Sequence, residues 1–349
     1  MNYVEIVNTI LENSSQLYRD TVPVMTQNNM KEVGNAILSY QAVKNEFLDA
    51  LVGRVAFTQV SNRRFSNPLA VLKKGSKPYG TDIEDIYVNP VKGVSYDGIT
   101  GTAGKDTSDM LEVTPPDVKT IFHRLNRQDK YPVSVSNAQL RTAFTSGHEM
   151  EKFIDSIMSA MYSGDEIAEF LLMRNLVTEA IADNKVKTMD FDYDGSEESC
   201  KDLVKLLKTL SLNFTLPSTE YNGYNVANAE GIAAKTTTPC TTWTPKENQV
   251  ILIRSDIDAS TDVEVLAKAF NMEKTDFIKR KFVVDSFGDT DTLCFITDEA
   301  AFDVTDVEYC VENFRNGSNL VTNFWLHHWQ RLSLSLFANG VAIKQKAAA

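Results

Sequence analysis

The spacing of apolar residues predicts helices throughout residues 1–54. Apolar side chains recur at positions i, i+3, i+4 and i+7, which is the pattern of a helix with one buried face. The residues that follow this spacing are Val4, Ile6, Val7, Ile10 and Leu11, then Val33, Ile37 and Leu38, and then Val43, Phe47, Leu48 and Leu51. A turn over residues 21–27, which contains Pro23, separates the first stretch from the others. We therefore expect an N-terminal helical arm.

Helical spacing disappears over residues 55–117. Strand-like pieces at residues 55–60 and 83–88 stand between prolines, and residues 93–104 are rich in glycine. A segment with so few apolar residues cannot bury a core of its own, and a structureless loop of this length is uncommon inside a compact domain. We predict a long extended hairpin that rests on a surface outside its own fold.

The strongest helical signal covers residues 147–184. Residues 146–149 and 163–166 each match the Ser-x-x-Glu capping box that marks a helix start, and apolar residues follow both at helical spacing. Because Gly164 lies at the second box, we predict one long helix with a kink or restart there. We expect its methionines to pack in a core rather than to form an adaptable binding groove.

The rest of the chain predicts a compact α/β module followed by return strands. Within residues 190–307, helical patterns alternate with short apolar runs, the helices at 197–210 and 262–272 and the strands at 250–254, 282–285 and 293–297. Residues 308–349 contain alternating strand-like stretches that we expect to pair with earlier strands and to close the domain that holds the long helix. The predicted fold class is α+β.

Composition permits a globular protein with a sizeable core. The chain has 349 residues, of which 43% are hydrophobic and 23% are charged, and its formal net charge is -12. No stretch has the length of a membrane span, and the N-terminus lacks the pattern of a signal peptide, so we expect a soluble protein made in the cytosol. The acidic balance disfavours a protein that coats nucleic acid. The four cysteines lie far apart, which disfavours a zinc or redox site.

One stretch departs from the acidic balance. Residues 54–80 contain arginines and lysines but no acid, and acids follow directly after. A solvated charged loop would explain this pattern. The alternative is a basic arm that docks on acidic patches of a neighbouring subunit. Under this hypothesis the inter-subunit contact residues are Arg63, Arg64, Lys73, Lys74, Lys77, Asp82, Glu84 and Asp85.

No arrangement of residues predicts catalysis or a bound cofactor. Residues 98–106 faintly resemble a phosphate loop, but Ile99 stands where its first glycine is required. His327 and His328 are adjacent, so on a strand they face opposite sides. The acids at 285, 289 and 291 lack the spaced ligands of a calcium loop. We therefore expect no enzyme activity, no cofactor and no metal.

The order of these elements resembles the HK97-type capsid fold, and the residues resemble the major head proteins of the phi29-like phages. The resemblance runs from about residue 28 to residue 343 and includes a specific stretch, Val265-Leu266-Ala267-Lys268-Ala269-Phe270-Asn271-Met272. Other matching stretches are Glu32-Val33-Gly34, Asn67-Pro68-Leu69, Lys73-Lys74-Gly75, Ile86-Tyr87, Phe122-His123, Asn126-Arg127-Gln128, Thr275-Asp276-Phe277, Trp329-Gln330 and Phe337-Ala338-Asn339.

The resemblance implies an arrangement of domains and a structural function. It implies an N-terminal arm (1–54), an extended loop (55–117), a peripheral domain with a spine helix (118–189, helix 147–184), an axial domain (190–307) and return strands of the peripheral domain (308–349). The subunit would assemble with itself in pentamers and hexamers, on a scaffolding protein and with a portal protein. It would form the icosahedral or prolate head that encloses phage double-stranded DNA, without sequence-specific binding, in the host bacterial cytoplasm.

Two other readings of the same sequence remain open. An encapsulin-like nanocompartment shell shares the architecture, and an uncharacterised α/β enzyme would share the module. Members of the phi29-like family can also carry a C-terminal immunoglobulin-like domain, which this chain lacks, so no surface role of that domain is expected here.

Overall fold

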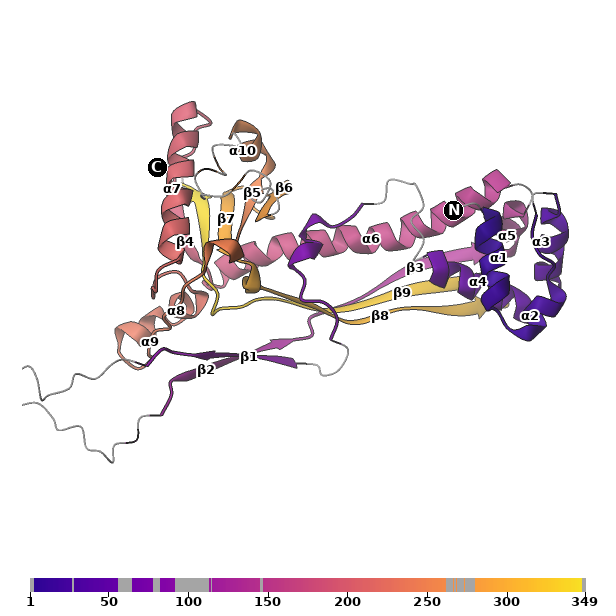
Figure 1. Cartoon of the computed structure of the whole chain (residues 1–349), viewed down its shortest axis with the longest axis horizontal. Helices are drawn as coiled ribbons and strands as arrows, with labels where there is room; N and C mark the ends of the chain where they lie inside the picture. The colour runs from indigo at the N-terminus through magenta and orange to yellow at the C-terminus, as the bar shows by residue number, and fades with distance from the viewer. Residues whose placement is uncertain are drawn as a thin grey trace, which may run out of the picture.

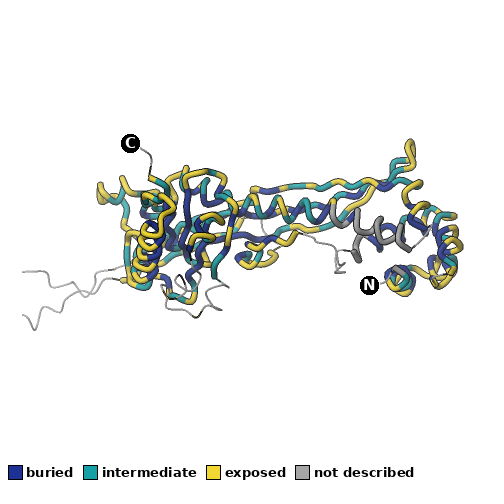
Figure 2. Tube along the Cα trace, turned by 90° about the horizontal axis from the view of Figure 1, so that it is seen from above, coloured by how far each residue is buried: buried dark blue, intermediate teal, exposed yellow. Residues whose placement is uncertain are grey.

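The computed structural model describes residues 3–26, 28–55, 65–77, 82–91, 113, 115–144, 147–261, 266, 268, 273 and 280–346. Figure 1 shows an elongated molecule with a helical bundle at one end and an α/β module at the other, joined by helix α6 and a long sheet. Buried residues concentrate in the two ends and along the sheet beneath the helix (Figure 2). Within the described ranges, no helix combines the length and the apolar character that a membrane crossing requires.

The helical bundle confirms the predicted N-terminal helices. It consists of α1 (Tyr3–Asn13), α2 (Gln16–Thr21), α3 (Met30–Ser39), α4 (Gln41–Val55) and α5 (Asn137–Ala143). Their apolar faces form one core, which includes Val7, Val33 and Phe47 and which extends to Phe324 and Leu326 of the long sheet. The strand-like piece predicted at residues 55–60 begins with Val55, the last residue of α4, and otherwise lies outside the described residues.

Helix α6 (Gly147–Ala182) is a single element of 36 residues. It is unbroken at Gly164, so the predicted restart is wrong. The second capping box does not act as a cap, because the Glu166 carboxylate instead accepts a hydrogen bond from the backbone N–H of Asn67 at 3.0 Å. A Cβ at Gly164 would lie 3.7 Å from the Tyr131 ring, which is an ordinary contact, so packing does not require glycine at this position.

The long sheet is antiparallel and packs on the first half of α6. Its strands are β3 (Arg127–Ser136), β9 (Val321–Leu334) and β8 (Phe302–Asn316), in the order β3-β9-β8. The strands β8 and β9 confirm that the sequence after residue 308 returns to the long helix. The face toward α6 is apolar near the helical bundle, where it carries Phe324 and Leu326, and polar further along β9, where His328 and Gln330 contact the helix.

The α/β module is a sheet between two helices. Its strands are β4 (Lys187–Phe191), β10 (Gly340–Gln345), β7 (Thr292–Asp298), β5 (Gln249–Arg254) and β6 (Lys281–Val284), in that order. Side chains such as Ile251 pack on α7 (Glu197–Phe214), and the alternate side chains, such as Leu252, pack on the second half of α6. Helix α6 is therefore shared between both sheets. The predicted helix at 262–272 lies largely outside the described residues.

Short elements complete the module and its connections. They are η1 (Pro68–Leu72), α8 (Gly223–Ala227), α9 (Ala229–Ala233), η2 (Lys246–Asn248), α10 (Ser255–Ser260) and η3 (Glu299–Ala301).

The last strand lies elsewhere than the sequence predicts. β10 joins the module, where it pairs in parallel with β4 and antiparallel with β7, rather than joining the strands that close on the long helix. Val341, Ala342 and Ile343 are all buried. A strand that is apolar on both sides is suited to the interior of a sheet with two covered faces, and the α/β module supplies that position.

The extended segment forms a two-stranded ribbon. β1 (Asp82–Val88) pairs antiparallel with β2 (Val118–Arg124). One face of the ribbon lies on the α/β module, where the Tyr87 ring stacks on Phe337 with centroids 5.4 Å apart and Lys119 Nζ donates to Thr238 Oγ1 at 2.8 Å. The predicted glycine-rich tip lies outside the described residues.

Candidate functional site

The segment before the ribbon, residues 67–77, is fixed to its own subunit. The Asn67 side chain caps η1 by accepting a hydrogen bond from the backbone N–H of Leu69 at 2.9 Å, and Leu69 is buried beside α6. The backbone N–H groups of Lys74 and Lys77 then donate to carbonyls of β8 at 2.9 and 2.8 Å. This segment is the first root of the ribbon, and it lies across both α6 and β8.

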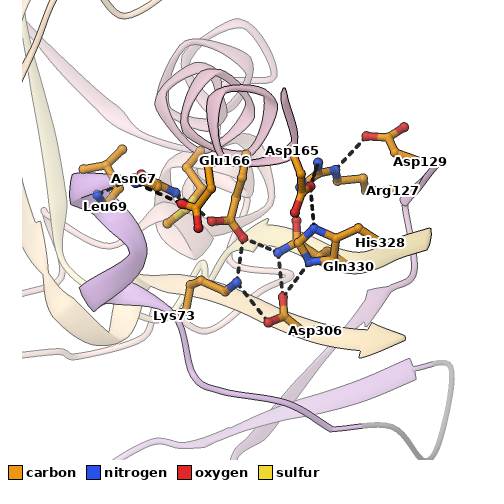
Figure 3. A network of polar contacts seen from close by, with 12 residues as sticks. Asn67, Leu69, Lys73, Arg127, Asp129, Asp165, Glu166, Asp306, His328 and Gln330 are labelled. Atoms are coloured by element: carbon orange, nitrogen blue, oxygen red, sulfur yellow. Dashed lines mark hydrogen bonds and ion pairs between the residues drawn. The ribbon is translucent and has the colours of Figure 1, made fainter. Parts of the chain in front are cut away.

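A buried ionic cluster holds the first root in place (Figure 3). Lys73 Nζ lies 2.6 Å from Glu169 Oε1 of α6 and 2.9 Å from Asp306 Oδ2 of β8. The Gln330 side-chain amide donates to the same two carboxylates. The Lys73 side chain is only 17% exposed, so most of it is removed from solvent.

The cluster continues through His328 to the third strand of the sheet. His328 Nδ1 lies 2.6 Å from Asp165 Oδ1, and His328 Nε2 lies 3.2 Å from Asp306 Oδ1. Arg127 of β3 donates to Asp165 Oδ1 at 2.8 Å and also to Gln330. The acids Asp165, Glu169 and Asp306 thus face Lys73, Arg127 and His328. We call these residues, with Gln330, the root clamp.

The electrostatics of the root clamp favour the charged form of its members. Burial opposes charge at Lys73, but hydrogen bonds and attraction from Glu169 and Asp306 outweigh it and raise the lysine pKa. Burial likewise opposes ionisation of Asp306, but hydrogen bonds from His328, Gln330 and Lys73 bring its pKa below the usual range. The pKa of Glu169 is lowered against burial by Lys73. The pKa of His328 is raised against burial by Asp165 and Asp306.

These shifts predict a stability maximum for the root clamp in weak acid. The lowered carboxylate pKa values stabilise the fold above about pH 4.5 and lose that effect as the pH falls. The raised pKa of His328 stabilises the fold below about pH 6.5 and loses its effect as the pH rises. His328→Gln should therefore lower the thermal midpoint most between these limits, and the difference from the unmodified protein should shrink as the pH rises through the raised pKa of His328. Thermal unfolding over a pH series measures this, and a pH-independent difference contradicts it.

The root clamp also contains a group with metal-ligating side chains. Ligand atoms of Glu169, Asp306 and His328 all lie within 4.8 Å of one another, which is the one such group among the described residues. Lys73 Nζ already contacts both carboxylates at hydrogen-bond distance. Because side-chain cations neutralise the acids, we assign this group to an ionic clamp rather than to a metal centre.

A second polar cluster holds the strand that leaves the ribbon. His123 of β2 is buried, and its Nδ1 lies 2.8 Å from Ser333 Oγ of β9. Its Nε2 lies 3.5 Å from Asp85 and 3.6 Å from Asp303 of β8. The Asp85 carboxylate, whose pKa is lowered chiefly by the neighbouring His123, accepts a hydrogen bond from Ser335 Oγ at 2.5 Å. Both roots of the ribbon therefore lie beside β8, and the second is hydrogen-bonded to Ser333 of β9 and to Ser335.

The structure divides the predicted contact residues into two groups. Lys73 and Asp85 bond within their own chain, as described above. Lys74, Lys77, Asp82 and Glu84 are exposed, although Lys74 Nζ lies 3.5 Å from Asp303 and Asp82 lies 3.7 Å from Arg124. Arg63 and Arg64 lie outside the described residues.

The outer face of the ribbon is an apolar surface that sequence reasoning missed. Val88 is paired with Val118, and Glu84 with Phe122, so these side chains share one face with Ile86. The four apolar members are all highly exposed, Phe122 at 58%, Ile86 at 55%, Val88 at 53% and Val118 at 46%. The alternation of charged and apolar residues in 82–88 was a signal for the β1 half of this surface. The β2 half could not be found in the same way, because the register that places Phe122 and Val118 beside β1 joins positions far apart in the chain.

Solved structures with a similar fold are phage capsid proteins. The capsid structure of Staphylococcus phage Andhra matches with a TM-score of 0.64 at 15% identity, over 83% of this chain and 87% of that chain. A structure of native bacteriophage P68, described as head fiber and inner core protein, matches with a TM-score of 0.62 at 14% identity, over 83% of this chain and 87% of that chain. The predicted HK97-type fold is confirmed.

Curated relatives share much more of the sequence. The major capsid protein of Bacillus phage PZA is 34% identical over 97% of this chain and 72% of its own length. That of Bacillus phage B103 is 33% identical over the same shares, and that of Streptococcus phage Cp-1 is 26% identical over 96% of this chain and 92% of its own length. These relatives are structural proteins, which favours neither a nanocompartment nor an enzyme.

The family model described as Phi29-like phage major capsid protein matches residues 7–344. This match includes the helical bundle, the ribbon, α6 and both sheets. The chain therefore belongs to the Phi29-like phage major capsid protein family, whose members are structural proteins of the virion capsid and not enzymes.

Proposed function

We propose that the ribbon is the part of this capsid subunit that binds the next copy in the shell. The observation that carries the proposal is its outer face, on which Ile86, Val88, Val118 and Phe122 stand exposed while the inner face is bonded to the subunit's own module. Solvent-exposed apolar side chains gathered on one strand pair are typical of an interaction surface. A two-stranded ribbon also has little stability alone, so contact with a neighbour would stabilise it.

The polar part of the proposed contact consists of exposed charges beside the first root. We propose Lys74, Lys77, Asp82 and Glu84 as contact residues, together with Arg63 and Arg64, which rest on the sequence alone. Lys73 and Asp85 are instead assigned to holding the ribbon, because their charged atoms bond to their own subunit. A basic root suits contact with another copy of this chain, because each copy has a formal net charge of -12.

Charge reversal tests the contact. We expect Lys74→Glu with Lys77→Glu to reduce shell yield at least tenfold while the thermal midpoint of the free subunit changes little, since exposed charges contribute only about 0.2–1 kcal/mol each to folding. The loss would arise because the repulsion repeats at each contact of the shell. Particle yield by sedimentation and electron microscopy measures it. Lys208→Glu, an exposed charge reversal on α7, is the matched control, and normal shells from the double variant would contradict the docking role.

We further propose the assembly partners and the division of the subunit. The copies would form pentamers and hexamers on a scaffolding protein, with a portal protein, in the host cytoplasm, and the head would enclose double-stranded DNA without reading its sequence. The net charge of -12 supports containment rather than coating, because such a wall repels phosphates. Expression with and without a scaffolding protein, followed by electron microscopy, tests whether assembly needs the scaffold. Closed regular heads that form without any scaffolding protein would show that it is not required.

The proposed domains are the arm (1–54), the extended loop (55–117), the peripheral domain (118–189), the axial domain (190–307) and the return strands (308–349). The pairing of β10 with β4 and β7 supports moving residues 340–345 from the last of these ranges to the axial domain. The pairing of β1 with β2 supports extending the loop to residue 124.

A further inference from the structure

The helical bundle covers the end of the long sheet (Figure 1), and three cations from α4, α5 and β8 act on one another there. Lys44 of α4 is buried, with 3% of its surface exposed, and its Nζ donates to Asn137 Oδ1 at the start of α5. Arg315 of β8 is close enough to Lys44 to contribute to its electrostatics, and so is Arg141 of α5. Within the described part of the chain, no carboxylate pairs with Lys44 or with Arg315.

Two donor atoms on the face of the long sheet that the helices cover are buried and have no hydrogen-bond partner. Arg315 Nε and Thr322 Oγ1 make no hydrogen bond to any described residue. Arg315 and Thr322 stand directly opposite each other on β8 and β9, and Thr322 in turn stands opposite the buried Val135 on β3, so these side chains share the face that the helices cover. Thr322 is only 2% exposed. A buried donor without a partner is costly, so each such group calls for an explanation, of which ordered water or a bound ion is one.

The charge balance indicates the sign of the missing group. Burial and the neighbouring Arg315 and Arg141 lower the pKa of Lys44. The surroundings of the ammonium group are thus unfavourable for a positive charge, in a chain whose net charge is -12. A bound anion would make these surroundings favourable for the charged ammonium group. It would pair with Lys44 and Arg315 and accept a hydrogen bond from the hydroxyl group of Thr322.

We propose that Lys44, Arg315 and Thr322 bind a phosphate group. An ammonium, a guanidinium edge and a hydroxyl from three different elements offer donors from several directions, which suits the several acceptor oxygens of a tetrahedral oxyanion better than a planar carboxylate. A recess of about 580 Å³ is lined by Lys31, Asn35 and Arg141, among others, and Arg141 also contributes to the electrostatics of Lys44. The phosphate group would come from free inorganic phosphate or from a nucleic-acid backbone.

Thermal unfolding of the full chain tests the site with inorganic phosphate. At the same ionic strength, phosphate should raise the thermal midpoint by about 2–5 °C over chloride or acetate, as expected for a ligand present well above its dissociation constant. Arg315→Gln and Lys44→Met should each weaken phosphate binding at least tenfold. Lys208→Met, which removes an exposed lysine from α7, should leave the response unchanged. An equal response to acetate, or an unchanged response in both variants, overturns the proposal.

Thr322→Val provides a test that does not depend on folding of the charge variants. Valine has the shape of threonine but lacks the hydroxyl group, so this variant should be as stable as the unmodified protein without phosphate and several-fold weaker in phosphate binding. If the role of Thr322 is purely structural, Thr322→Val should change the thermal midpoint equally with and without phosphate. That result overturns the part of Thr322 in the site. A short DNA duplex that competes with phosphate assigns the site to a nucleic-acid backbone, whereas failure to compete assigns it to the free ion.

Discussion

Lys73→Met should lower the free energy of unfolding of the subunit by about 3–5 kcal/mol, the usual cost of removing one partner from a buried ion pair. Methionine fills a similar volume, but it leaves Glu169 and Asp306 without the ammonium group that both contact. The two carboxylates, together with the neighbouring Asp165, would then face only Arg127 and His328. Denaturant unfolding of the unassembled chain measures the loss.

The control for this prediction is the next residue in the chain. Lys74→Met removes an exposed lysine, whose side chain is 39% accessible, and should change stability by less than about 0.5 kcal/mol. Adding Glu169→Gln to Lys73→Met should recover part of the loss, because one of the uncompensated charges is then removed. If Lys73→Met proves as stable as the unmodified subunit, the root clamp does not hold the ribbon, and Lys73 becomes available for the contact between copies.

Ile86→Asp combined with Phe122→Asp should abolish shell assembly. Burying side chains of this size is worth about 1.5–3 kcal/mol each. Losing about 3 kcal/mol in total corresponds to more than a hundredfold in the association constant of every contact. Because both side chains are exposed in the subunit, the free chain should still fold, with nearly the same thermal midpoint. Particle counts by electron microscopy and circular dichroism of the unassembled fraction separate the two effects.

The matched control for the ribbon lies at the other end of the molecule. Val24 is also highly exposed, at 64%, and belongs to the helical bundle rather than to the ribbon. Val24→Asp should assemble normally. Shells of ordinary size and yield from the ribbon variant would show that its outer face faces solvent in the head, and the proposed function of the ribbon would then be wrong.

The sequence predicted those parts of the fold whose signals are local. Helical spacing located α1, α3, α4 and α7, and short apolar runs located β5, β6 and β7, because each signal is complete within one element. The resemblance to phi29-like head proteins supplied the arrangement and the family. The prediction of one long helix is confirmed by α6. The restart that was expected as an alternative to a kink is absent, because the capping-box pattern at 163–166 also occurs inside helices, where the glutamate finds another partner, here the backbone of Asn67.

The site required information that no local pattern contains. Lys73 was predicted as a free docking residue because it stands in an acid-free run, but its partner Glu169 lies 96 positions away. The root clamp brings together residues of the ribbon root, α6 and all three strands of the long sheet. The apolar face of the ribbon depends in the same way on the register between β1 and β2. The strand β10 was misplaced because an apolar strand gives no indication of which sheet receives it.

Both roots of the ribbon lie beside β8, and the ribbon is also fixed further out. Asp306 holds the incoming segment and Asp303 faces His123 on the outgoing one, so a shift of this part of β8 carries both roots together. Tyr87 and Lys119, near the far end of the strand pair, contact the α/β module. The long sheet, the ribbon and the module are thus linked in one closed loop of contacts, so the subunit presents the outer face of the ribbon from a braced arm rather than from a hinge.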